Sequence, residues 1–144
     1  MLSSAVRSLR ALWAAVTLGG LSALAVLTVL AVSAESHPMA AHADTAFYVC
    51  ALYSALALVV AFALLARMRS RLAEAPSEAA ALATARMHGV AALAAAESSA
   101  ILAGVVVFLT GNVLAAAYAV PFLAFAAITW PTESRVASWL AVRR

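Results

Sequence analysis

Apolar residues dominate four stretches of the chain, and most polar residues lie in the segments between them. The stretches cover residues 11–33, 45–66, 87–110 and 113–130. Each is about 20 residues long, the length that an α-helix needs to cross roughly 30 Å of hydrocarbon. Polar and apolar residues do not alternate as in a half-buried strand, and an open sheet cannot hide its edges in lipid. The pattern predicts an all-α, polytopic membrane protein in which residues 1–144 form one small four-helix transmembrane bundle.

The third helix is expected to begin before its apolar stretch. Pro76 interrupts the preceding helix and Ser77 is a favoured N-cap residue, which predicts a helix over residues 78–110. Only Gly111 and Asn112 separate this helix from the fourth apolar stretch, and both residue types tolerate the left-handed backbone of a sharp reversal. The last two helices should therefore form a tight antiparallel hairpin.

A short amphipathic helix is expected after the fourth apolar stretch. In "PTESRVASWLAVRR", Thr132 can cap a helix over residues 132–142, on which Val136, Trp139 and Leu140 share one face. Such a helix favours the headgroup plane of a bilayer, so we expect it to lie at the cytoplasmic interface.

The charge pattern predicts the orientation. The chain is 67% hydrophobic and 10% charged, with a net charge of +3, and all nine basic side chains are arginine. They fall in the N-terminal tail, the segment after the second stretch and the C-terminal tail: Arg7, Arg10, Arg67, Arg69, Arg71, Arg86, Arg135, Arg143 and Arg144. The positive-inside rule then places both termini of this multi-pass membrane protein in the cytoplasm. The basic charge indicates contact with the lipid bilayer and no nucleic-acid partner.

The N-terminal segment allows a second interpretation, because residues 1–34 combine arginines, an apolar stretch and small residues near Ala34, as a secretory signal does. Signal peptides have apolar regions of about 7 to 15 residues, which is shorter than this one, so an uncleaved first helix is favoured. Cleavage after Ala34 would leave three helices that start outside, and the remaining arginines would satisfy the positive-inside rule equally well.

One carboxylate interrupts the third apolar stretch. Glu97 lies about 10 residues from one end of that stretch and about 13 from the other, which places it near the bilayer midplane at 1.5 Å per residue. A charge there costs about 2.5 to 3.5 kcal/mol, and a carboxylate avoids this cost by binding a proton. Ala94, Ala100 and Gly104 lie at three- and four-residue spacings around it and predict close helix packing. Glu97 should therefore be protonated and face protein.

The candidate partners of Glu97 are hydroxyl groups. Ser98 is adjacent, and Tyr53 and Ser54 fall at the same depth in the second helix. None of the residues at this depth is basic, so an ion pair within one chain is not expected. Two interpretations remain open: Glu97 is a hydrogen-bonded tie between helices, or it carries a proton or a cation.

The stretch "ALAAAESSAILAGVVVFL" resembles the carboxylate-bearing helix of the c-subunit (proteolipid) of rotary ATP synthases. The resemblance places Glu97 on the ion-binding glutamate and Ile101 and Gly104 on the residues that follow it. It implies a proton or cation carrier that works in a ring. The glycine-repeat helix of that family is missing, since the first stretch contains only Gly19 and Gly20.

The C-terminal half, with "VVFLTGN" and "WPTESRVASWL", is similar to small bacterial four-helix membrane proteins of unassigned function. This similarity implies a fold and a location in the bacterial cytoplasmic (inner) membrane, and it implies no activity.

The segment "ESHPMAAHAD" gathers possible metal ligands. His37, His42 and Asp44 are residue types that bind zinc or copper, but the five-residue histidine spacing is not helical and Pro38 breaks the segment. A polar turn is the favoured interpretation, and no cofactor is expected. Cys50 is the only cysteine, which excludes an intrachain disulfide.

No catalytic motif is found, neither a Ser-His-Asp set nor HExxH nor paired carboxylates. We therefore expect a non-enzymatic structural or accessory subunit of a membrane assembly, in a homo-oligomer or a larger membrane complex. The alternative is a c-subunit-like ion carrier that uses Glu97.

Overall fold

The computed structural model describes residues 2–141, and it is all-helical over that range, as the sequence predicts. Residues 1 and 142–144 lie outside the described part, including Arg143, Arg144 and the last residue of the expected C-terminal helix. The α-helices are α1 (Leu2–Val32), α2 (Ala43–Ala73), α3 (Glu78–Thr110), α4 (Val120–Ile128) and α5 (Glu133–Ala141), and the 3-10 helices are η1 (Ala40–His42) and η2 (Val113–Ala119).

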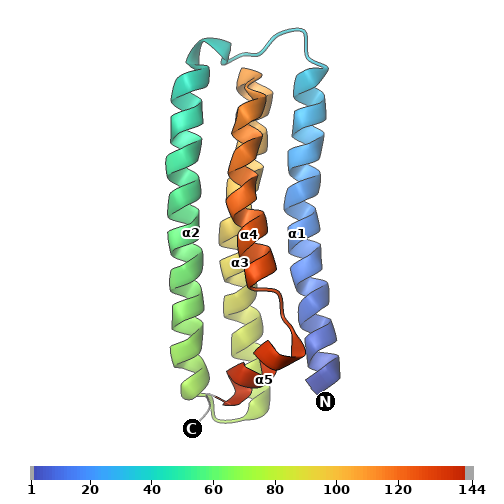
Figure 1. Cartoon of the computed structure of the whole chain (residues 1–144), viewed down its shortest axis with the longest axis vertical. Helices are drawn as coiled ribbons and strands as arrows, with labels where there is room; N and C mark the ends of the chain where they lie inside the picture. Colours follow the sequence, from blue (N-terminus) through green and yellow to red (C-terminus); the bar gives the residue numbers. More distant parts are fainter. Residues whose placement is uncertain (1, 142–144) are drawn as a thin grey trace.

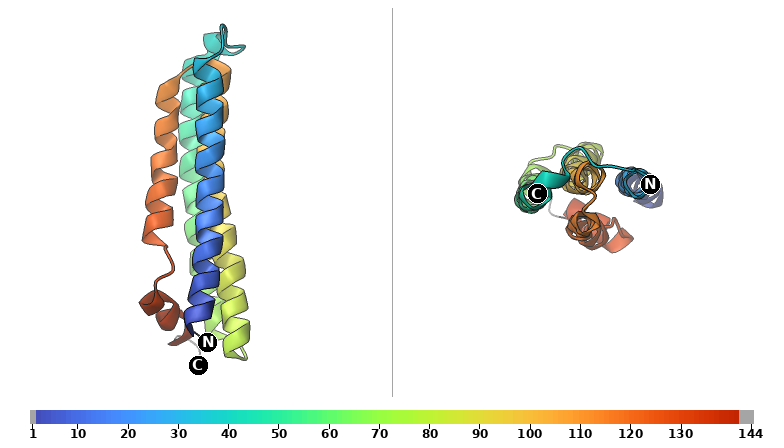
Figure 2. Two further views of the ribbon diagram at one scale, coloured as in Figure 1. Left: turned by 90° about the vertical axis from the view of Figure 1, so that its right-hand side faces the viewer. Right: turned by 90° about the horizontal axis from the view of Figure 1, so that it is seen from above.

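The helix α3 is the centre of the molecule. It lies between α1 and α2, with η2 and α4 against its front, while α5 turns across the lower end (Figures 1 and 2). In the most apolar 18-residue stretch of each long helix, 50% is buried in α3, against 22% in α2 and 11% in α1. Most of the apolar surface of α1 and α2 is thus left facing outward.

Both ends of α3 are capped as expected. Ser77 Oγ accepts a hydrogen bond from the Ala80 N–H at 3.2 Å, and Gly111 ends the helix in the left-handed conformation with φ of 72°. A Cβ atom on Gly111 would lie 2.5 Å from Cδ2 of His37, so glycine is required there for space as well as for its backbone. Asn112 keeps a negative φ and caps η2 by accepting from the Leu114 N–H at 3.1 Å.

Two helices are longer than the sequence pattern indicates. The helix expected over residues 11–33 begins at Leu2, and the one expected over residues 45–66 continues to Ala73. The apolar pattern marks only the part of a helix that could lie in hydrocarbon. The extra turns at one end of each helix carry the arginines and pack on α3 and α5. Leu9 of α1 and Met68 and Leu72 of α2 are buried there, in two separate clusters.

The helix expected over residues 113–130 extends over Val113–Ile128 and changes type along its length. Val113–Ala119 forms a 3-10 helix, and the α-helix extends only over Val120–Ile128. Pro121 has no N–H to donate to the carbonyl of Ala117 four residues earlier, and the Val120 N–H bonds that carbonyl in the tighter 3-10 pattern instead.

A bend of 69° separates the η2–α4 segment from α5. Arginine side chains fix its carbonyl groups: Arg135 Nη1 donates to the Trp130 oxygen at 2.6 Å, and Arg10 Nε donates to the Pro131 oxygen at 3.1 Å. Thr132 Oγ1 caps α5 by accepting from the Arg135 N–H, as expected. Among residues 2–141, the three helices α1, α2 and α3 are long and apolar enough to cross a membrane, and the bent η2–α4–α5 segment would make a fourth.

Trp13 belongs to the core between α1, α3 and α4. Its side chain is 1% exposed, its Nε1 donates to Thr129 Oγ1 at 3.3 Å, and a Cβ atom on Gly89 would lie 2.3 Å from the ring. Trp13 lies at the boundary of an apolar stretch, a position that is typical of an aromatic ring at the level of the lipid headgroups. Here the ring is buried inside the protein, because Gly89 has no side chain and leaves space for it.

Candidate functional site

Glu97 lies at the seam between α1 and α3, against two consecutive glycines. A Cβ atom on Gly20 would lie 2.7 Å from Cγ and 3.1 Å from Oε1 of Glu97, and one on Gly19 would lie 3.2 Å from Oε1. Gly20 is buried and Gly19 is exposed, so the carboxyl group lies across the edge of the seam. Because neither glycine has a side chain, the Glu97 side chain packs directly against the α1 backbone at these two positions.

The contact of Glu97 with Gly19 and Gly20 depends on the register of α1 and α3, which run in the same direction (Figure 1). Three glycines along the α1–α3 contact each face a larger residue: Gly89 faces Trp13, Gly20 faces Glu97 and Gly104 faces Leu27. The α3 backbone also comes close to α1 at Gly104, where a Cβ would lie 3.2 Å from the Leu24 Cα. Close approach through small residues is a usual basis of helix association in lipid.

The carboxyl group of Glu97 is half-buried, and within residues 2–141 it has no ion pair. The exposed residues around it include four small ones, Ala15 and Gly19 on α1 and Ala91 and Ala94 on α3. One larger side chain, Ile101, is also exposed one turn after Glu97. One side of the glutamate is thus covered by α1, and the other borders an open surface of small residues. We call the surface formed by Ala15, Gly19, Ala91 and Ala94 the small-residue face.

The expected hydroxyl partners lie on the other side of α3, toward α2. Tyr53 donates from its hydroxyl to Ser98 Oγ at 3.0 Å, so these two candidate residues are bonded to each other. Ser54 is buried and donates to the Cys50 carbonyl of its own helix at 2.8 Å. The structure therefore joins Tyr53 with Ser98 and places Glu97 on a different contact, because consecutive residues of a helix point about 100° apart.

The structure places the residues of the expected packing stripe around Glu97 on two different faces of α3. Ala100 and Gly104 are buried against the rest of the protein, but Ala94 is exposed. Six residues correspond to about 600° of helical rotation, so Ala94 and Ala100 point about 120° apart and cannot both face α1. Ala94 belongs to the small-residue face instead.

The residues predicted as weak metal-ligand candidates lie at the end opposite the arginines. The His37 Nδ1 lies 3.1 Å from the Phe108 carbonyl, and the Met39 N–H donates to the Leu109 oxygen at 2.9 Å. The segment therefore covers the carbonyl end of α3. Within the part of the chain that the structure describes, no three His, Cys, Asp or Glu side chains are close enough to hold a metal ion.

Two features of this region were not identified from the sequence. The first is the contact of Gly19 and Gly20 with Glu97. The sequence does contain a signal for it, since the glycine pair lies about 10 residues into the first apolar stretch, the same depth as Glu97 in the third. The second is Thr17, whose buried hydroxyl oxygen has no hydrogen-bond partner in the described residues. A threonine in an apolar helix gives no signal of this kind before its neighbours are known.

Comparisons with models of known protein families, with curated proteins and with solved structures found no match to this chain. The function is therefore argued from the site and its surroundings.

Proposed function

We propose that this protein is a non-enzymatic integral membrane protein of the bacterial inner membrane, and that it serves as a structural or accessory subunit of a membrane assembly. In this proposal α1, α2, α3 and the η2–α4 segment are the membrane spans, and α5 lies at the cytoplasmic interface. A protonated Glu97 lies at the interface between helices near the middle of the membrane.

The distribution of arginine supports this topology. The described arginines lie at the start of α1, the end of α2, the start of α3 and in α5, and these segments meet at the lower end of the molecule in Figure 1. The opposite end holds Glu35, His37, His42 and Asp44 and no arginine among the described residues. A cytoplasmic lower end satisfies the positive-inside rule and places both termini in the cytoplasm.

The observation that carries the proposal is the half-covered Glu97 beside the small-residue face. In a single chain inserted in lipid, the open side of this polar group would meet hydrocarbon, where even a neutral polar group loses its hydrogen-bonding partners. A helix of another subunit packed on the small-residue face would cover it, and small residues allow the backbones to approach closely. The proposed subunit is either a second copy of this chain or an unlike membrane protein.

The alternative proposal is a proton or cation carrier similar to the c-subunit. Its support is the mid-span position of Glu97 and its half-open surroundings, which leave a path to the carboxyl group. A structural tie is favoured because Glu97 and the Tyr53–Ser98 pair lie on different contacts of α3, so they do not form a joint ligand set for a cation.

Replacing Glu97 by glutamine separates the two proposals. Glutamine keeps the shape and the hydrogen bonds of a protonated glutamate but cannot release a proton. If Glu97 is a tie, E97Q should assemble like the wild type, whereas E97A should weaken the assembly by about 0.6 to 2 kcal/mol. The readout is the fraction of assembled protein on dilution in mild detergent.

A hydrophobic carbodiimide provides the second readout, since it reacts with protonated carboxyl groups in apolar surroundings. Proton flux into vesicles that contain the wild type, abolished both by the reagent and in E97Q, would contradict the structural proposal and establish the carrier. Equal and negligible flux for wild type and E97Q is the result that the structural proposal predicts.

A further inference from the structure

A cleft of about 250 Å³ opens between α2, α4 and α5 at the arginine-rich end. Its polar end is formed by Arg69 of α2 and Arg135 of α5, and its apolar wall includes Phe62 and Leu65 of α2 and Ile128 of α4. Trp13 and Trp139 also line it. The cleft is separate from Glu97, which lies on the α1–α3 seam.

The charge in the cleft is uncompensated. No aspartate or glutamate lines it, and within residues 2–141 neither Arg69 nor Arg135 forms an ion pair. Arg135 uses Nη1 to hold the Trp130 carbonyl, which fixes the guanidinium and leaves its other N–H groups free to donate. Arg69 forms no hydrogen bond in the described structure. Two guanidinium groups in one cleft match the fork geometry that binds phosphate oxygens.

The apolar wall of the cleft requires that the ligand also has an apolar part. The side chains of Phe62 and Ile128 are 53% and 63% exposed, so the wall continues outward onto the apolar surface of α2 and α4. Phe62 lies seven residues before Arg69, about 10 Å along the helix at 1.5 Å per residue. The headgroup layer on each side of a bilayer is about 5 to 7 Å thick, so arginines at its level place Phe62 in the hydrocarbon.

We propose that this cleft binds an anionic phospholipid, with the phosphodiester between Arg69 and Arg135 and an acyl chain along Phe62 and Ile128. The cleft is smaller than typical drug-sized ligand pockets, which begin at about 300 Å³. It therefore encloses the headgroup, and the acyl chains lie in the outer groove. Basic pockets between transmembrane helices on the cytoplasmic side are known to take such headgroups.

The proposal rests on the membrane location proposed above and is independent of Glu97. A protein that is not recovered in the membrane fraction would overturn the proposed function. A protein that is recovered there but shows no preference for anionic lipid would overturn only this inference.

The test is lipid retention, measured by native mass spectrometry of the full chain in detergent micelles with added phosphatidylglycerol or phosphatidylcholine. The wild type should retain one phosphatidylglycerol per chain in preference to phosphatidylcholine. R69Q/R135Q should weaken this binding roughly thirtyfold, because each of the two arginine–phosphate hydrogen bonds lost contributes about 1 kcal/mol. R69Q alone keeps the Arg135–Trp130 bond and should give part of the loss, so the result does not depend on a variant that could disturb the bend.

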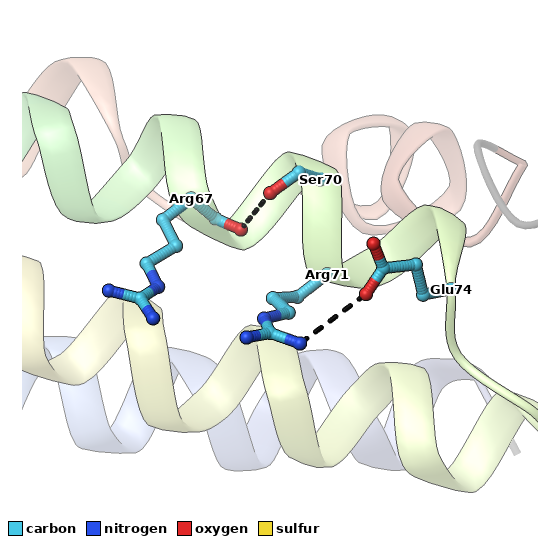
Figure 3. A network of polar contacts seen from close by, with 4 residues as sticks. All are labelled: Arg67, Ser70, Arg71 and Glu74. Atoms are coloured by element: carbon cyan, nitrogen blue, oxygen red, sulfur yellow. Dashed lines mark hydrogen bonds and ion pairs between the residues drawn. The ribbon is translucent and has the colours of Figure 1, made fainter.

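The matched control is R67Q/R71Q, which removes two arginines from the same end of α2. Figure 3 shows these residues in a separate exposed network, where Arg71 Nη1 lies 3.4 Å from Glu74 Oε2 and Ser70 donates to the Arg67 carbonyl at 2.8 Å. Neither lines the cleft. The control should bind phosphatidylglycerol like the wild type. Equal losses in both double variants, or no preference in the wild type, would overturn the proposal.

Discussion

Replacing Trp13 by alanine is expected to cost about 3 kcal/mol of unfolding free energy. Truncation of a buried tryptophan costs about 3 to 5 kcal/mol in soluble proteins. The lower end applies because the unfolded chain in a micelle keeps the ring in apolar surroundings. The loss arises from the cavity left against Gly89 and from the missing N–H donor to Thr129. The measurement is unfolding by titration with a denaturing detergent in mixed micelles.

Two companion variants separate the causes. W13F keeps most of the ring volume and loses the hydrogen bond at 3.3 Å, so it should cost about 1 kcal/mol. L18A removes a side chain of the same helix that is 62% exposed, and it should change the stability little. If W13A destabilises the protein no more than L18A does, Trp13 is not the packed centre of the α1–α3–α4 contact.

Replacing Gly20 by alanine should destabilise the protein by about 1 to 3 kcal/mol. The new Cβ would lie 2.7 Å from the Glu97 Cγ, so either α1 and α3 must move apart or the Glu97 side chain must turn away from the contact. In an E97A background the same change should become neutral or stabilising. The colliding atoms are then absent, and alanine is favoured over glycine inside a helix by about 0.5 to 1 kcal/mol. The double-mutant cycle should thus give a coupling energy of about 2 kcal/mol.

Gly19 provides the matched control for this cycle. Its Cβ would come no closer than 3.2 Å to Oε1 at the end of the Glu97 side chain, which can move. G19A should therefore cost less than G20A and show weaker coupling to E97A. An equal cost for G20A with and without the glutamate would place Glu97 away from Gly20 and would remove the basis of the proposed site.

The boundaries that local chemistry controls could be predicted from the sequence. The range of α3 follows from Pro76 and Ser77 at one end and Gly111 at the other, and each acts through its own backbone or side chain. The 3-10 helix before Pro121 was also accessible in principle, since a proline affects the carbonyl four residues earlier. The added turns of α1 and α2 were not, because their stability comes from tertiary contacts with α3 and α5.

The candidate site shows the same division. The depth of Glu97 could be counted, but depth alone admitted Tyr53 and Ser54 as partners and did not fix which face of α3 meets which helix. The observed contact is set by rotation and register, through glycines that face Trp13, Glu97 and Leu27 in turn. A missing side chain carries no hydrophobic signal, so the pattern that predicts the helices cannot predict these contacts.

The proposed function requires that another subunit covers Glu97 through the small-residue face, and native mass spectrometry of protein gently solubilised from its own membranes would detect that subunit. Three samples are needed: the wild type, A94W, which fills the small-residue face at an exposed position, and L56W, which places the same side chain at a residue of α2 that is 57% exposed. We expect a complex of several copies or of unlike subunits for the wild type and L56W, and a monomer for A94W. A monomeric wild type, or a complex that survives in A94W, would contradict the proposal.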